Sequence, residues 1–190
     1  MAEKKHTQDP LDLEEAMSSS EAFIIKYKNK FLAGIAAIVI VVGGVLGYQN
    51  FISEPNEKKA SEALYRGEQY FMADNYELAL NGDSLGFEGL LKVADKYSGT
   101  AAGKLANAYA GLSYAQLGQL DKAAATLVKA ADKANSQALS PIYLIQAGQI
   151  YEKLGKNSEA VKAYQTVKEK YPNNYLSMDI EKYIERASVK

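Results

Sequence analysis

The sequence offers one motif that resembles a catalytic nucleophile, Gly82-Asp83-Ser84-Leu85-Gly86. The pattern Gly-x-Ser-x-Gly serves catalysis when it places a serine on a sharp turn between a strand and a helix, within reach of a histidine base. No strand pattern precedes Gly82, and the single histidine, His6, lies ahead of a long apolar stretch. We therefore expect residues 81–89 to be a flexible insertion between helices, and Ser84 to have no catalytic role.

The composition argues against most other chemistry. The 190 residues include no cysteine, which removes disulfides, thiolate metal sites and cysteine nucleophiles. Metal sites usually need clustered histidine or cysteine, and phosphate-binding loops and dinucleotide fingerprints are missing from the sequence. The formal net charge of −1 gives no basic face for nucleic acid. We expect a protein that is not an enzyme and that binds no cofactor, metal or nucleic acid.

Small and aromatic residues recur 37 residues apart in the second half of the chain. The first set is Gly111, Tyr114, Gly118, Ala123 and Ala130, and the second is Gly148, Tyr151, Gly155, Ala160 and Val167. A fixed period of this length indicates stacked helical hairpins, and such stacks are usually binding surfaces rather than active sites.

The offsets assign a packing role to each recurring residue. Gly118 ends a first helix over about 102–117, because a left-handed residue costs glycine nothing. Gly111 and Ala123 are small where two helices approach, and Leu127 fills the space beside them. An altered first unit carries Gly67, Tyr70, Tyr76 and Ala79 at the same offsets, with Asp74 at the position of the turn glycine.

These patterns predict an all-α fold in which one N-terminal transmembrane helix precedes a short α-solenoid with a C-terminal capping helix. The repeat resembles the tetratricopeptide repeat, a helix-turn-helix of about 34 residues. The predicted units cover about 60–96, 101–135 and 139–172, and the predicted cap covers 175–189.

A charge-free stretch from Phe31 to Phe51 predicts the membrane span. About 20 helical residues cover the roughly 30 Å hydrocarbon layer. A cleaved signal peptide is the alternative, but some 30 residues precede the apolar run and six of them are acidic. Ser18-x-x-Glu21 resembles a capping box, so we expect the helix to begin near Ser19. The predicted segments are a disordered tail over 1–18, an anchor over 19–53 and a repeat domain over 54–190.

Charges beside the span predict its orientation. Lys26, Lys28 and Lys30 precede the span, whereas Glu54 and Glu57 follow it, which places the N-terminus in the cytoplasm. Within the span, Gly43-x-x-x-Gly47 would let another helix approach closely, although glycine is common in membrane helices for other reasons.

In stacked hairpins the first helices of successive units line a concave face, and the register places a set of residues there. We expect this face to hold a segment of a partner protein; the alternative is that these are ordinary exposed positions with some hydrophobic residues by chance. The predicted groove residues are Leu64, Glu68, Phe71, Met72, Leu112, Gln116, Ile145, Gln149, Glu152 and Lys153.

The layout of residues 19–190, together with the stretch from Gly82 to Thr100, resembles YfgM-like bacterial membrane proteins of the Bacteroidetes type. That resemblance implies an accessory subunit of the Sec translocon in the bacterial inner membrane, with its repeat domain in the periplasm. Its partners would be translocon subunits, a membrane-anchored periplasmic chaperone-isomerase or emerging secretory chains, and no catalytic residues carry over. The alternative function is a self-assembling envelope scaffold that forms a homo-oligomer through Gly43, Gly47 and the C-terminal helix and recruits other cell-envelope proteins.

Overall fold

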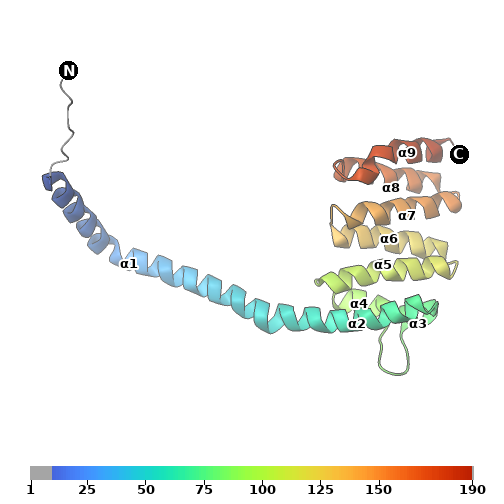
Figure 1. The fold of residues 1–190 in the computed structure, drawn as a ribbon, viewed down its shortest axis with the longest axis horizontal. Coiled ribbons are helices and arrows are strands. Elements are labelled where there is room, and N and C mark those ends of the chain that lie inside the picture. Colours follow the sequence, from blue (N-terminus) through green and yellow to red (C-terminus); the bar gives the residue numbers. More distant parts are fainter. Residues whose placement is uncertain (1–9, 190) are drawn as a thin grey trace, which may run out of the picture. The chain divides into compact units, whose positions relative to one another are not determined.

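A computed structural model describes residues 10–189, and every regular element within that range is a helix (Figure 1). The all-helical prediction is thereby confirmed for the described residues. The chain divides into two compact units, an N-terminal unit that ends at Phe51 and a C-terminal unit that begins at Ile52.

The N-terminal unit consists of α1 (Pro10–Tyr48) and the start of a π-helical turn, η1 (Gln49–Ser53). Its most apolar window has a mean hydropathy of 2.4 and no buried side chains, so this helix is long and apolar enough to cross a membrane. The structure begins α1 at Pro10 and not near Ser19. Residues 1–9 of the predicted disordered tail over 1–18 lie outside the described residues. Proline suits a first helical turn because the amide hydrogen it lacks would have no intrahelical partner there.

The C-terminal unit is a stack of paired helices, which form the repeat units. Its elements are α2 (Glu54–Met72), α3 (Tyr76–Asn81), α4 (Leu90–Lys96), α5 (Ala101–Gln116), α6 (Leu120–Ala134), α7 (Leu139–Lys153), α8 (Asn157–Lys170), the 3-10 turn η2 (Tyr175–Asp179) and α9 (Ile180–Ser188). From α5 to α9 the helices lie one upon the next in chain order (Figure 1).

The same turn ends the first helix of each of the three repeat units. Gly118 and Gly155 have φ angles of 72° and 71°, and Asp74 takes the equivalent position with φ 58°. In each turn the amide of the next residue donates to the carbonyl of the tyrosine that recurs in the unit, Tyr70, Tyr114 or Tyr151, at 2.9 Å. This bond satisfies a carbonyl at the end of the helix that would otherwise have no partner. The predicted correspondence of Asp74 with the turn glycines is confirmed.

A glycine also marks the contact between the two helices of every unit. A Cβ on Gly111 would lie 2.8 Å from Leu127 Cγ, and one on Gly148 would lie 2.4 Å from Tyr164 Cε1. In the first unit Gly67 approaches Leu90 in the same way, with 2.4 Å to Leu90 Cδ2. Leu90 comes seven residues later than the offset of the other two pairs. The second helix of the first unit is therefore a split helix, α3 and α4, with a seven-residue insertion between them.

The insertion is an ordered loop, which corrects the expectation of flexibility at 81–89. Gly82 and Gly89 close its base with φ angles of 92° and 89°, and a Cβ on either would collide with backbone on the opposite strand of the loop. The Asp83 amide donates to the Phe87 carbonyl at 2.9 Å, and the Phe87 side chain is 3 % exposed. Because Phe87 is buried, the loop gains apolar contacts that a solvated insertion would lack.

Candidate partner-binding face

The first helices of the three units enclose a hollow that we name the α2–α5–α7 hollow. Its volume is about 510 Å³, and its walls are Glu57, Ser61, Leu64, Ala101, Ala102, Lys104, Leu105, Ala134, Ser136, Leu139 and Tyr143. Aliphatic side chains supply most of the wall, and a few polar groups lie among them, as in ligand-binding sites generally. Leu139 is 42 % exposed at the rim, whereas Leu64 is almost fully buried.

Glu57 joins α2 to α5 at one end of this hollow. Its two carboxylate oxygens accept hydrogen bonds from the amides of Ala101 and Ala102, at 3.0 and 3.1 Å. Thr100 adds a side-chain cap to the Gly103 amide at 2.9 Å. Three of the first amides of α5 are thus satisfied, and the carboxylate charge is offset by the positive end of the helix.

Two tyrosines lie along the inner side of α5 and α7. Burial, followed by a hydrogen bond with Glu68, raises the pKa of Tyr109. Burial alone raises the pKa of Tyr143, which is 7 % exposed and has no hydrogen-bond partner for its hydroxyl among the described side chains and backbone. Tyr143 therefore adds a hydroxyl that opens into the hollow to a mostly apolar wall.

The predicted groove residues of the first unit have different environments. Leu64 lines the hollow, and Glu68 is the partner of Tyr109. The Phe71 ring packs edge-on against Tyr109, with 5.3 Å between centroids, so it belongs to the interior of the stack. Met72 is 71 % exposed and remains available to a partner.

The predicted groove residues of the other two repeat units also differ in exposure. Three of them are exposed: Gln116, Gln149 and Lys153. Leu112 is half-buried against the hydrophobic core formed by α5 to α9. Ile145 is part of that core and is 9 % exposed. The structure thus places some of the predicted face in solvent and some in packing contacts, and a role in binding stays a prediction for all ten residues.

Glu152 has a structural partner in the capping helix. Its carboxylate accepts a hydrogen bond from the Tyr164 hydroxyl at 2.6 Å and two from the Arg186 guanidinium at 2.9 and 2.6 Å. Burial and this bond to Glu152 raise the pKa of Tyr164, and the same carboxylate raises the pKa of Arg186. Replacing Glu152 would therefore disturb α9 as well as any bound partner.

Several residues of the hollow were not predicted from the sequence. They include Ser61, Leu105, Leu139 and Tyr143. Leu105 and Tyr143 do not repeat as the same residue at 37-residue spacing, so the repeat register gives no signal for them. The spacing of Leu105, Tyr109 and Leu112 by four and three residues does place them on one side of a helix, and that pattern was available.

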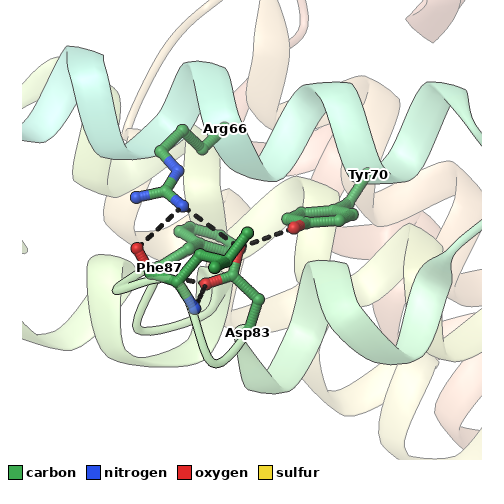
Figure 2. A network of polar contacts seen from close by, with 5 residues as sticks. Arg66, Tyr70, Asp83 and Phe87 are labelled. Atoms are coloured by element: carbon green, nitrogen blue, oxygen red, sulfur yellow. Dashed lines mark hydrogen bonds and ion pairs between the residues drawn. The ribbon is translucent and has the colours of Figure 1, made fainter.

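The Gly-x-Ser-x-Gly loop is organised by its aspartate (Figure 2). The Asp83 carboxylate accepts hydrogen bonds from the Tyr70 hydroxyl at 2.5 Å, from Arg66 at 3.1 Å, and from the amides of Leu85 and Phe87 at 2.8 and 2.9 Å. These donors, led by Tyr70, lower the pKa of Asp83. Asp83 therefore has a structural task, and Ser84 lies exposed beside it.

The geometry gives no metal or catalytic constellation in the part of the chain that the structure describes. No group of three His, Cys, Asp or Glu side chains within residues 10–189 is arranged to hold an ion. His6 lies outside the described residues. In α1, Gly43 is exposed and Gly47 is partly buried, and both have open space where a Cβ would stand.

Comparison with known proteins identifies one repeat. Residues 143–174 match the tetratricopeptide repeat family model, and this range holds most of α7, all of α8 and the turn that follows. No curated protein and no solved structure matched the chain significantly. A tetratricopeptide repeat is therefore present in the third unit, and repeats of this type suggest a role in protein–protein interaction.

Proposed function

We propose that this chain is a non-catalytic, membrane-anchored adaptor that binds a protein partner through the face formed by α2, α5 and α7. The observation that carries the proposal is the α2–α5–α7 hollow, whose aliphatic wall is open to solvent at Leu139. An open apolar hollow bounded by successive helices is suited to a segment of another chain. Because three units make a short face, a single bound segment should have modest affinity.

The anchor is the helical segment over residues 19–53, and the repeat domain is residues 54–190. The apolar length of α1 supports the anchor, and the lysines before the span support a cytoplasmic N-terminus. A single cysteine at Ser20 or at exposed Ser158, labelled in intact cells with a membrane-impermeant reagent, tests this orientation. Ser158→Cys should react and Ser20→Cys should not; the opposite pattern would overturn the orientation.

The finer assignment is an accessory subunit of the bacterial Sec translocon in the inner membrane, with a periplasmic repeat domain. It rests on the resemblance of the layout to YfgM-like proteins. Under this proposal the repeat domain holds the membrane-anchored chaperone-isomerase or an emerging secretory chain, and the anchor contacts translocon helices.

A second function, a self-assembling envelope scaffold that recruits other envelope proteins, is favoured by one observation. Gly43 and Gly47 lie one helical turn apart with open space around them, so a second copy of α1 could approach closely. Gentle detergent extraction, affinity purification and mass spectrometry separate the two functions. Recovery of translocon or chaperone subunits supports the adaptor, whereas recovery of this chain alone at a discrete multiple of its mass supports the scaffold.

The same purification tests the binding face when it is repeated with Leu112→Glu. Leu112 is half-buried on α5, and a carboxylate there would oppose an apolar partner. Gln165→Glu, at an exposed position on α8, is the matched control. Loss of the partner with Leu112→Glu alone supports the face, provided that the circular dichroism spectrum is unchanged; equal recovery with both variants would remove it.

A further inference from the structure

The chemistry of the α2–α5–α7 hollow identifies what it would accept, and this inference rests on the proposed function. Leu64, Leu105 and Leu139 form walls from three different helices, and the volume of about 510 Å³ leaves ample room for one large aliphatic side chain. Burying such a side chain is the main source of affinity available at this site.

The ionised groups of the wall have unequal roles. Glu57 already accepts two backbone hydrogen bonds at the start of α5, and the helix N-terminus offsets its charge. Lys104 lies one turn further along α5, and its ammonium makes no ion pair or hydrogen bond with any described residue. A ligand would therefore meet a lysine whose positive charge is not yet compensated by a bonded carboxylate.

Tyr143 supplies a second polar group without a partner. Its side chain is more than nine-tenths buried, it lines the hollow, and its hydroxyl lacks a hydrogen-bond partner in residues 10–189. A hydroxyl that opens into the hollow can donate a hydrogen bond to a ligand oxygen, which replaces the bond to the water that the ligand displaces.

From these three features we infer that the hollow binds a peptide segment in which a large aliphatic residue is followed directly by an acidic residue. The aliphatic side chain enters between α2, α5 and α7, and the neighbouring carboxylate accepts hydrogen bonds from the Lys104 ammonium and the Tyr143 hydroxyl. The occupant is a segment of a partner protein, and the ionic contact adds specificity to the apolar one.

The test uses the full chain in lipid nanodiscs and three synthetic, fluorescein-labelled peptides. The peptides are identical Gly/Ser sequences except for a central Leu-Glu, Leu-Gln or Leu-Lys. Fluorescence anisotropy should show the Leu-Glu peptide binding about fivefold more tightly than the Leu-Gln peptide, as expected for a partly exposed ion pair. The Leu-Lys peptide should bind most weakly.

Charge reversal makes the test specific. Lys104→Glu should invert the order so that the Leu-Lys peptide binds most tightly, whereas Lys129→Glu, on the outer helix α6, should leave the order unchanged. Ser61→Phe, which places a ring at the mouth of the hollow, should abolish binding of all three peptides. Its circular dichroism spectrum checks that it is folded.

Three results would overturn the inference: equal affinity for the three peptides, no binding of any peptide, or an order that Lys104→Glu does not change. Tight competition by unlabelled chain would also overturn it, because it would make a second copy the occupant. None of these results bears on partner recovery in the Leu112→Glu comparison. The adaptor function therefore stands or falls separately.

Discussion

Gly148 of α7 lies so close to the ring of Tyr164 in α8 that a Cβ on the glycine would come within 2.4 Å of Cε1. The ring cannot withdraw easily, because it is fully buried and its hydroxyl donates to Glu152 at 2.6 Å. The pairs Gly111–Leu127 and Gly67–Leu90 repeat the contact in the other units. One close approach per repeat unit thus sets the distance between its first helix, which lines the hollow, and its second helix.

Gly148→Ala should destabilise the repeat domain by about 2 kcal/mol, because the added methyl overpacks a core that cannot relax. Urea unfolding of the detergent-solubilised chain, followed by circular dichroism, measures the change. Gly99→Ala is the control, since nothing lies within 4 Å of that position. An equal midpoint for Gly148→Ala and Gly99→Ala would show that α7 and α8 are not held at this distance.

The Asp83 network should make stability depend on acid pH. Hydrogen bonds hold the pKa of Asp83 below its ordinary 3.8, so its contribution is complete above that value and is lost as the pH falls through the lowered pKa. Asp83→Asn should therefore be less stable than the parent near neutral pH, and the difference should shrink below pH 3.8. Urea midpoints at several pH values measure this.

Asp132→Asn, which changes an exposed carboxyl on α6, is the control for that series. Hydrogen exchange near neutral pH gives a second readout, because Asp83→Asn should speed exchange at the Leu85 and Phe87 amides in particular. A constant gap between parent and variant at all pH values, with unchanged exchange at these amides, would contradict the assigned role of Asp83.

Arg186 and Glu152 should be energetically coupled. A double-mutant cycle with Arg186→Ala and Glu152→Ala should give a coupling of about 1 kcal/mol, a modest value because Arg186 is half exposed to screening solvent. Higher salt should reduce the coupling. Purely additive effects on urea unfolding would mean that this ion pair does not hold α9 against α7.

The sequence predicted the elements whose signal is periodic and missed those whose signal is local. The turn position of Asp74 and the contacts of Gly111 with Leu127 follow from offsets that every unit must satisfy. The ordered loop at 81–89 was missed because its order comes from Asp83, whose four donors lie on α2 and within the loop. Spacing alone gives no indication that a short Gly-rich segment will find such partners.

The candidate site was predicted less completely than the fold. The repeat register alone placed Ile145 and Phe71 on an open face. In the structure Ile145 is buried in the core, and the Phe71 ring packs against Tyr109 of α5. Tyr143 and Lys104 are candidate binding residues because both line the hollow between α2, α5 and α7. That environment depends on tertiary contacts between units, which no repeat offset encodes.

The apolar surface of α1 should be required for membrane attachment. Ile38→Arg combined with Val42→Arg should cost about 3 kcal/mol per residue at the centre of a span and should release the protein from carbonate-washed membranes. Ile38→Leu with Val42→Leu should remain in the membrane pellet. Retention of the double arginine variant would mean that α1 does not span the bilayer.

The central claim is that a partner protein binds on the face of α2, α5 and α7, and photo-crosslinking in native membranes tests it most directly. Benzoylphenylalanine would replace Met72 or Gln149 on that face, and Lys129 or Gln165 on the outer helices α6 and α8, all of them exposed. We predict one shared crosslinked partner from Met72 and Gln149 and none from Lys129 and Gln165. Crosslinks from the outer positions alone, with the inner face silent, would contradict the claim.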